Sequence, residues 1–329
     1  MKKNVVILGA GASYGAREPK PPLGNTLHKW VLDYFREKYD ELSDWENSGE
    51  EEINRKRIKK LLEEATSFES MANDLQRQQR GNDLAKLNFL LAASMTPPLN
   101  LEDTEPRVND AFIEKPDLFD GWLKKSIGTK EKLGNTSFIT LNYDCLLERA
   151  ICRTYFTQEE KESQCLCNHI CYHLTEDPQE EVEVFKLHGS INWIGDPTKE
   201  IEFNSHRPDY QTIKVVPSLH GELDEQDPTE LILASYANGK LPQANLTTLQ
   251  KIRGRALEQI TKAANIEIIG VHIPPHEDDD PSLWEVLQHL KGKTVDFINP
   301  SRVENDLAKS KFSFNVIRKT FREYVDSLT

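Results

Sequence analysis

The chain has no long hydrophobic run and a shortage of positive charge, and each absence excludes a class of protein. Among its 329 residues, no stretch approaches the roughly 20 apolar residues that a membrane-spanning helix needs. Lysine and arginine number 41 against 54 acidic residues, so the formal net charge is -13. Non-specific binding to nucleic acids depends on clustered cations that release counterions. We therefore expect neither membrane association nor autonomous nucleic-acid binding.

Cysteine is also scarce, with five residues in the whole chain. An odd number in a large acidic protein does not form a disulfide framework by count, so we expect reduced thiols. Three cysteines alternate with two histidines, at Cys165, Cys167, His169, Cys171 and His173. In a strand this alternation would place all five on one face, as either a metal-prone strip or a half-buried surface. The spacing is not that of a zinc finger or ribbon, so no metal is expected.

The first residues imitate a secretion signal, because two lysines precede the apolar run at residues 5–8. That run is short and breaks into glycines, which suits a buried first strand better. We therefore assign the protein to the cytoplasm. The hydrophobic fraction of 37% and the charged fraction of 29% are typical of a globular protein with long, solvated helices.

Several short apolar segments share one feature, which is that each stops at a glycine, an asparagine or a histidine. This pattern is typical of an open parallel sheet that binds a nucleotide along the carboxyl edge of its strands. We predict an α/β fold with a Rossmann-like, mostly parallel sheet flanked by helices. The segments are residues 5–8 before Gly9, 137–141 before Asn142, 182–187 before His188, 266–269 before Gly270, and 294–298 before Asn299.

Residues 28–135 lie between the first two predicted strands and have helical periodicity. Apolar residues recur at helical spacing around Ile58, Phe68 and Leu87, and again from Phe119 onward. We interpret this segment as a mostly helical insertion within a single NAD-binding domain that spans residues 1–329. Its functional signal is weak.

The turn after the first segment contains a fragment of a dinucleotide-binding fingerprint, Gly9-Ala10-Gly11-Ala12-Ser13. In the functional interpretation, backbone amides at the helix start and the Ser13 hydroxyl cradle a pyrophosphate. In the structural interpretation, the glycines serve a tight strand-to-helix turn. Gly-x-Gly alone does not distinguish the two. Ser13 and His188 do not indicate an acyl-transfer pair, because no Gly-x-Ser-x-Gly motif accompanies them.

A set of strings, taken in order, carries a family resemblance. They are Gly9-Ala-Gly-Ala-Ser13, Thr140-Leu-Asn-Tyr-Asp144, Lys186-Leu-His-Gly-Ser-Ile-Asn-Trp193, Ile268-Ile-Gly-Val-His-Ile-Pro-Pro275 and Phe297-Ile-Asn-Pro300. This order resembles the sirtuin-like domains of bacterial defence proteins, which split NAD. The resemblance runs along nearly the whole chain, although no recognised motif covers residues 28–135.

The resemblance implies roles for individual residues. Asn142 would lie against the nicotinamide ribose and orient a water, and His188 would be the catalytic histidine beside that ribose. Asp144 would support the asparagine loop and the ribose pocket. The other NAD-binding residues would be Gly9, Ala10, Gly11 and Ser13 at the pyrophosphate, Gly189 and Ser190 in the histidine loop, Gly270 and Asn299 at the adenosine half, and His272 in place of a hydroxyl that touches phosphate.

The reaction is reasonable for these residue types. Nicotinamide leaves from a positively charged ring, so the reaction passes through an oxocarbenium-like ribose that needs positioning more than a strong nucleophile. An asparagine offers both a donor and an acceptor to a water molecule. A histidine, with an ordinary pKa of about 6.5, can accept a proton at neutral pH.

Three departures from the family pattern bear on function. No cysteine follows Cys171, so the two Cys-x-x-Cys pairs of sirtuin deacylases are missing and no separate zinc ribbon is expected. The string Gly270-Val-His-Ile273 stands where relatives have Gly-Tyr-Ser-Leu. After the prolines, Glu277 or Asp278 would fill the acidic position. We expect this acidic stretch to cap a helix over residues 281–290.

We expect an NAD glycohydrolase that takes NAD as its substrate and releases nicotinamide and ADP-ribose. The resemblance implies an NAD-depleting effector of antiphage defence, activated by an infection signal, by a partner such as an ATPase encoded nearby, or by assembly into a homo-oligomer. The alternative is a non-catalytic NAD or ADP-ribose sensor that regulates a partner protein. Protein deacylation or ADP-ribosyl transfer is a third interpretation, and the missing zinc ribbon argues against deacylation.

Overall fold

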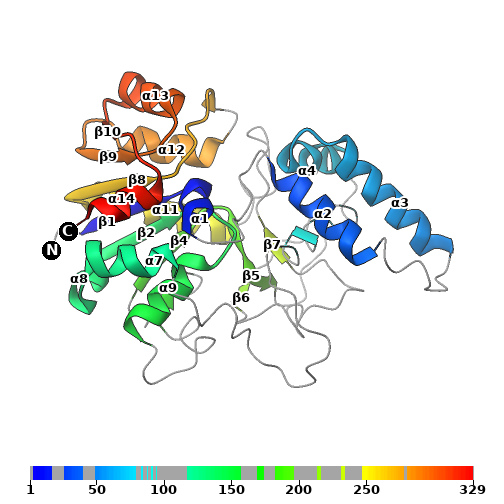
Figure 1. Ribbon diagram of the computed structural model, residues 1–329, viewed down its shortest axis with the longest axis horizontal. Helices are drawn as coiled ribbons and strands as arrows, with labels where there is room; N and C mark the ends of the chain where they lie inside the picture. Colours follow the sequence, from blue (N-terminus) through cyan, green and yellow to red (C-terminus); the bar gives the residue numbers. More distant parts are fainter. Residues whose placement is uncertain are drawn as a thin grey trace.

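Seven parallel strands form the central sheet, in the order β10-β9-β8-β1-β2-β4-β3 (Figure 1). The computed structural model describes residues 3–16, 26–39, 49–78, 117–156, 169–173, 182–195, 213–215, 231–233, 247–277 and 280–328, with single positions at 83, 87, 90, 91 and 94. The strands are β1 (Asn4–Leu8), β2 (Thr136–Thr140), β3 (Ile170–Cys171), β4 (Val182–Lys186), β8 (Asn265–Ile269), β9 (Val295–Ile298) and β10 (Asn315–Ile317). The predicted Rossmann-like parallel sheet is confirmed.

The strand ends are level with one another along the carboxyl edge of this sheet. Leu8 at the end of β1 pairs with Thr140 of β2 on one side and Ile269 of β8 on the other. The register continues outward, because Thr140 pairs with Lys186 of β4 and Ile269 pairs with Ile298 of β9. The residues that follow these strands therefore converge on a single edge.

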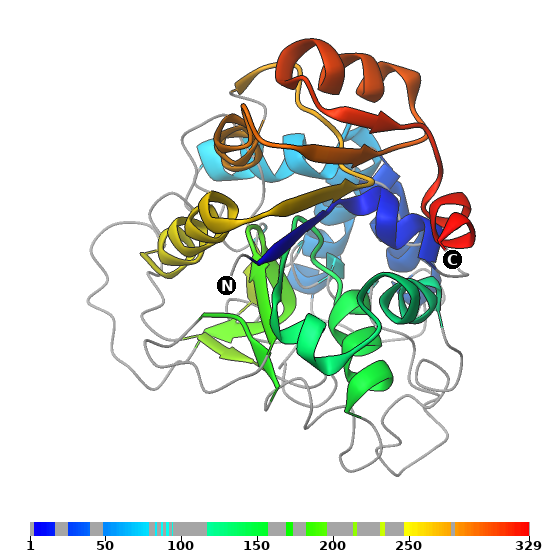
Figure 2. The same cartoon turned by 90° about the vertical axis from the view of Figure 1, so that its left-hand side faces the viewer.

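Helices cover both faces of the sheet (Figure 2). One face carries α1 (Ala10–Ala16), α7 (Leu118–Trp122), α9 (Leu146–Tyr155) and α14 (Phe321–Ser327), and the other carries α11 (Thr247–Lys262) and α12 (Pro281–His289). A π-helical turn, η2 (Leu123–Ile127), and α8 (Lys130–Gly134) lead into β2, while α13 (Arg302–Phe312) connects β9 to β10. Among the described helices, none is long and apolar enough to span a membrane.

Aromatic side chains join the helical layer to the central strands. The fully buried Trp122 ring meets Phe138 of β2 and Phe321 of α14 edge-on, at centroid distances of 6.3 and 6.0 Å. Phe119 of α7 also contacts Phe321, at 5.1 Å. Truncating a buried aromatic residue of this kind typically costs about 3–5 kcal/mol. The cluster therefore fixes α7 and α14 on the sheet beside α1.

A second, antiparallel sheet begins directly after the histidine loop. It consists of β6 (Ile213–Val215), β5 (Gly189–Gly195) and β7 (Leu231–Leu233), in that order. In Figure 1 it lies between the central sheet and a group of helices formed by the insertion. The sequence pattern did not indicate β5, because its apolar residues do not form a run.

The helical insertion packs around a second hydrophobic cluster, to which Tyr143, Cys145 and Ile191 also contribute. Its helices are α2 (Leu27–Tyr39), α3 (Gly49–Glu64) and α4 (Phe68–Arg77), and Leu87, Leu90 and Leu91 join the same cluster. Helices therefore occur within the predicted insertion, while its extent over residues 28–135 and the single-domain organisation stay predictions. Within residues 28–135, however, Phe119 and the residues after it belong to the core around the central sheet. We call α2, α3 and α4, with the three leucines, the helical module.

Candidate functional site

The turn after β1 lies so close to the loop after β8 that only glycine fits at three positions. A Cβ atom on Gly9 would lie 2.6 Å from the Gly270 oxygen, and one on Gly270 would lie 2.3 Å from the Ala12 nitrogen. Gly11 would make a similar clash with Gly270, and Gly270 also has a positive φ of 65°. The backbone amides of Gly9 and Gly11 donate to the oxygens of Ile269 and Gly270, at 3.0 and 2.9 Å. The glycines therefore have a packing role whether or not a phosphate binds, and their expected phosphate contact stays a prediction.

Asn142 joins the end of β2 to this glycine turn. Its side-chain nitrogen donates to the Gly9 oxygen at 3.1 Å and to the Ser13 hydroxyl at 2.8 Å. Its backbone nitrogen donates to the Thr140 hydroxyl at 3.0 Å. With both amide hydrogens directed inward, the side-chain oxygen is the group that can accept a hydrogen bond from a ligand. The structure thus brings together Gly9, Ser13 and Asn142, three residues that the sequence singled out from distant positions.

His188 lies beside Asn142 and has a defined tautomer. Its Nδ1 is 3.0 Å from the backbone oxygen of Leu141, the residue just before Asn142. A carbonyl only accepts hydrogen bonds, so Nδ1 carries the hydrogen, and in the neutral ring the lone pair is on Nε2. This nitrogen faces Asp280, whose Oδ1 is 3.7 Å away. The imidazole is therefore oriented with its basic nitrogen away from the strand end.

A buried ion pair supports the loop that carries Asn142. Lys186, the last residue of β4, donates from Nζ to the Glu148 carboxylate at 2.8 Å and to the Asp144 backbone oxygen at 2.6 Å. Both charged side chains are essentially inaccessible to solvent. Burial lowers the pKa of Lys186, but Glu148, with smaller effects from Cys145 and Asp144, outweighs burial, so the pKa is raised overall and the ammonium keeps its charge. Desolvating two charges costs free energy, so the ion pair is expected to add little net stability. Its contribution is to hold the Asp144 backbone, and with it the asparagine loop, in place.

The histidine loop and the asparagine loop are also tied directly. Gly189 has a positive φ of 79°, and the Ser190 hydroxyl donates to the Tyr143 oxygen at 3.3 Å. Ser190 also lies 3.6 Å from the Cys145 sulfur. Burial raises the pKa of the Cys145 thiol to about 11, so it is not a thiolate nucleophile at neutral pH. Gly189 and Ser190 therefore tie the histidine loop to the asparagine loop, and their contact with NAD stays a prediction.

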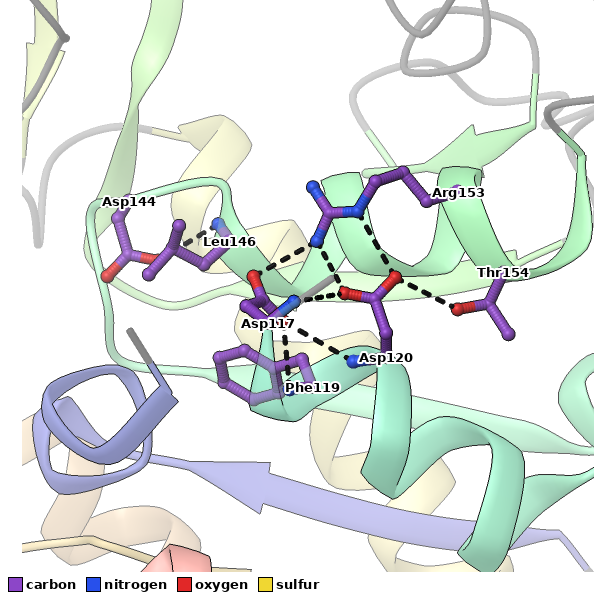
Figure 3. Close-up of polar contacts among 7 residues, drawn as sticks. All are labelled: Asp117, Phe119, Asp120, Asp144, Leu146, Arg153 and Thr154. Carbon is purple, nitrogen blue, oxygen red and sulfur yellow. Dashed lines mark hydrogen bonds and ion pairs between the residues drawn. The ribbon is translucent and has the colours of Figure 1, made fainter. Parts of the chain in front are cut away.

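Asp144 has a local structural role in this conformation. Its carboxylate accepts a hydrogen bond from the Leu146 amide at 3.1 Å, at the start of α9 (Figure 3). Further along the same helix, Arg153 is held by Asp117 and Asp120 of the neighbouring α7, at 3.0 and 2.7 Å. Burial, followed by the charge of Asp120, outweighs the effect of Arg153 and raises the pKa of Asp117 to about 7. Sequence reasoning missed this cluster, which anchors α9 and hence the end of the asparagine loop.

The adenosine side of the predicted site is ordered by two buried polar side chains. Asn299 donates from Nδ2 to the Val271 oxygen at 2.9 Å, which holds the loops after β8 and β9 together. Glu304 accepts from the Ile273 amide at 2.7 Å and contacts His272 Nδ1 at 2.6 Å. The His272 side chain is 74% exposed, so its ring faces solvent at this edge. Contact of His272, Gly270 and Asn299 with NAD stays a prediction.

Asp280 faces His188, with the two side chains 3.7 Å apart. Of the two candidates for the acidic position after the prolines, Glu277 is exposed and Asp278 lies outside the described residues, so that assignment stays a prediction. Asp280 is also the N-cap of α12, because Oδ1 accepts from the Leu283 amide at 3.0 Å and Pro281 follows. The expected acidic helix cap is confirmed. The Asp-Pro pair signals a helix start, but no local pattern could show that the carboxylate faces a histidine 92 residues earlier in the sequence.

The alternating cysteine and histidine residues do not form one strand face in the part that is described. Strand β3 ends at Cys171, and His173 has a left-handed φ of 57°. His169 stacks on Phe156 and His173 stacks on Phe185, at 4.1 and 4.5 Å. The single-face interpretation is therefore wrong for this segment. Cys165 and Cys167 lie outside the described residues, and within those that are described no metal-binding group of three or more ligands occurs.

The thiols differ from the expectation at one position. Cys145 and Cys171 are free and buried, whereas Cys152 in α9 is disulfide-bonded. The expectation of reduced thiols throughout is therefore wrong at Cys152.

One comparison with known families bears on the site. The family model of a SIR2-like domain matches residues 136–246. This stretch contains Asn142, Asp144, His188, Gly189 and Ser190, so it supports the sirtuin-like resemblance where the two candidate catalytic side chains lie. No curated protein matches the chain.

Proposed function

We propose that the protein is an NAD glycohydrolase that releases nicotinamide and ADP-ribose. The observation that carries this proposal is that His188 contacts the backbone of Leu141, the residue directly before Asn142. The Leu141 oxygen orients the imidazole, and the next residue supplies the amide. The SIR2-like match covers both side chains, and NAD is the substrate of SIR2-like domains.

In the proposed reaction, the glycosidic bond between the ribose C1′ and nicotinamide breaks, and its electron pair neutralises the pyridinium ring. A water oxygen bonds to C1′, and its proton passes to Nε2 of His188 and then to solvent. The Asn142 side-chain oxygen accepts a hydrogen bond from that water and holds it near the sugar. Both residues act mainly by positioning, because the leaving group is already activated by its charge.

The test is release of nicotinamide from NAD by the purified protein, alone and with the product of the neighbouring gene. His188→Ala and Asn142→Ala should each lower kcat by at least about 100-fold, the lower range for a positioned proton acceptor. His289→Ala is the matched control, because this exposed histidine contacts the Glu285 oxygen of its own helix. Full turnover in either site variant would contradict the proposal.

A second candidate function is a non-catalytic NAD or ADP-ribose sensor. One observation favours it, namely that Asn142 and His188 are only 8% and 2% exposed and both bond within the protein. The sensor hypothesis predicts NAD binding by calorimetry with no nicotinamide release under any activating condition. Release of free ADP-ribose, without labelled protein, would in turn exclude ADP-ribosyl transfer.

The biological setting that we propose rests on the resemblance. The enzyme would act in the cytoplasm as an antiphage effector that depletes NAD after activation by a partner or by assembly into a homo-oligomer. Expression with and without phage challenge, followed by measurement of cellular NAD, tests this setting. A constant NAD level during infection of cells that carry the intact protein and its neighbouring genes would contradict it.

A further inference from the structure

We propose that Asp280 is a positioning residue for His188, so that the proposed site includes the N-terminus of α12. This inference rests on the proposed function for its catalytic consequence, although the contact itself is structural. Asp280 lies outside the stretch that matches a SIR2-like domain. It lies 92 residues after the histidine in the sequence.

The two side chains face each other, and both are largely buried. Nε2 of His188 lies 3.7 Å from Oδ1 of Asp280, and their side chains are 3% and 13% exposed. On its other edge, the imidazole is held by the Leu141 oxygen through Nδ1. The ring is therefore bracketed by a neutral acceptor on one nitrogen and a carboxylate near the other.

Asp280 is itself held in place. The same Oδ1 accepts from the Leu283 amide at 3.0 Å, and the Asp280 backbone oxygen accepts from the Trp284 amide at 2.9 Å. Leu283, further along α12, is buried in the main core. A helix N-terminus favours a negative charge, so the carboxylate is stabilised where it faces the histidine. These contacts fix the position of Asp280 relative to α12.

A carboxylate near Nε2 would stabilise the positive charge that forms on the His188 ring only during the reaction. When Nε2 takes the proton from the attacking water, the ring becomes an imidazolium next to a carboxylate. At 3.7 Å the contact is electrostatic, so Asp280 acts through its charge, and Nε2 returns the proton to solvent.

The competing interpretation is that Asp280 only caps α12. Asn and Ser are good N-caps, so Asp280→Asn and Asp280→Ser remove the carboxylate while keeping the cap, whereas Asp280→Ala removes both. A positioning role predicts that Asn and Ser lower kcat about 10- to 100-fold with KM and melting temperature little changed. Thr320→Ala is the matched control, since Thr320 caps α14 through the Glu323 amide. Turnover at the wild-type rate in Asp280→Asn and Asp280→Ser would overturn the inference.

A second measurement does not require turnover. The ring ¹⁵N resonances of His188 are compared in unliganded wild type, Asp280→Asn and Thr320→Ala at one neutral pH. The Nε2 resonance should move in Asp280→Asn and stay in place in Thr320→Ala. An unmoved resonance would overturn the inference even in an active enzyme. If the resonance moves but the wild-type protein never hydrolyses NAD, the pairing stands and the proposed function fails.

Discussion

Glu183 is a carboxylate at the amino end of β4, far from the proposed site, and several donors surround it. Lys3 and Ser137 donate to one oxygen at 2.8 and 2.6 Å, and His173 lies 3.5 Å from the other. Burial alone would raise its pKa, but these partners outweigh burial and lower the pKa to about 2. The side chain is only 20% exposed, so the interaction is weakly screened.

The first prediction concerns acid stability. Because the pKa of Glu183 is lowered from its ordinary 4.5 in the folded state, its stabilisation is complete above about pH 4.5 and is lost as the pH falls toward 2. A shift of this size corresponds to roughly 3 kcal/mol. Glu183→Gln should lower the free energy of unfolding at pH 7 and flatten its dependence on pH between 5 and 3. Urea titrations of both proteins across this range measure it, and parallel pH profiles would contradict it.

At the scale of single residues, the sequence pattern identified the polar side chains that directly follow a strand. It missed the polar side chains that contact the site region from helices distant in the sequence. Asn142 and His188 were predictable because a polar residue stops an apolar run at each position. Asp280 and Glu304 were not, because their partners lie 92 and 32 residues away in the sequence. Such contacts depend on how helices dock, which local patterns do not encode.

The ion pair between Lys186 and Glu148 joins two elements, β4 and α9. Since both side chains are buried, the pair also decides where the intervening Asp144 backbone lies. Replacing only one partner would leave an uncompensated buried charge, whereas replacing both with apolar residues of similar volume removes the desolvation cost.

The second prediction follows from this asymmetry. Lys186→Met should destabilise the protein by about 3–5 kcal/mol, and the double variant Lys186→Met with Glu148→Leu should recover most of that loss. Turnover of NAD should stay low in the double variant, because the Asp144 oxygen has lost its donor. Urea unfolding measures the change in stability, and nicotinamide release measures the change in turnover. Full turnover in a stable double variant would show that the ion pair does not position the loop.

At the scale of elements, the sequence predicted the inner strands well and the periphery poorly. Strands that are buried on both faces have continuous apolar sequences, so the bounds of β1, β2, β4, β8 and β9 were predicted to within one residue at each end. Strand β10 was missed because it is a three-residue edge strand that is only partly buried. The two-residue β3 was misjudged for a similar reason, since alternation implied a longer strand than the chain forms.

At the scale of the whole molecule, the helical module is in direct contact with the proposed site. The hydrophobic cluster of the module includes Tyr143 and Cys145, which flank the asparagine loop, and Ile191, which follows the histidine loop. Residues next to Asn142 and His188 therefore belong to the same hydrophobic cluster as the helices of the module. Anything that shifts or loosens the helices, including a bound partner, would act on both loops at once.

The last prediction tests this coupling. Leu62 of α3 is fully buried in the module, and Leu62→Ala should cost about 2–5 kcal/mol through the cavity it leaves. The matched control is Ile260→Ala in the main core, because Ile260 is as fully buried as Leu62. Ile260 lies near the carboxyl end of α11, and Ala264, just after this helix, donates to the Lys3 oxygen at the amino edge of the sheet, away from the proposed site. Below the melting temperature of both variants, Leu62→Ala should release nicotinamide several-fold more slowly than wild type, while Ile260→Ala should retain its rate. Equal rates in the two variants would show that the module is attached to the site without supporting it.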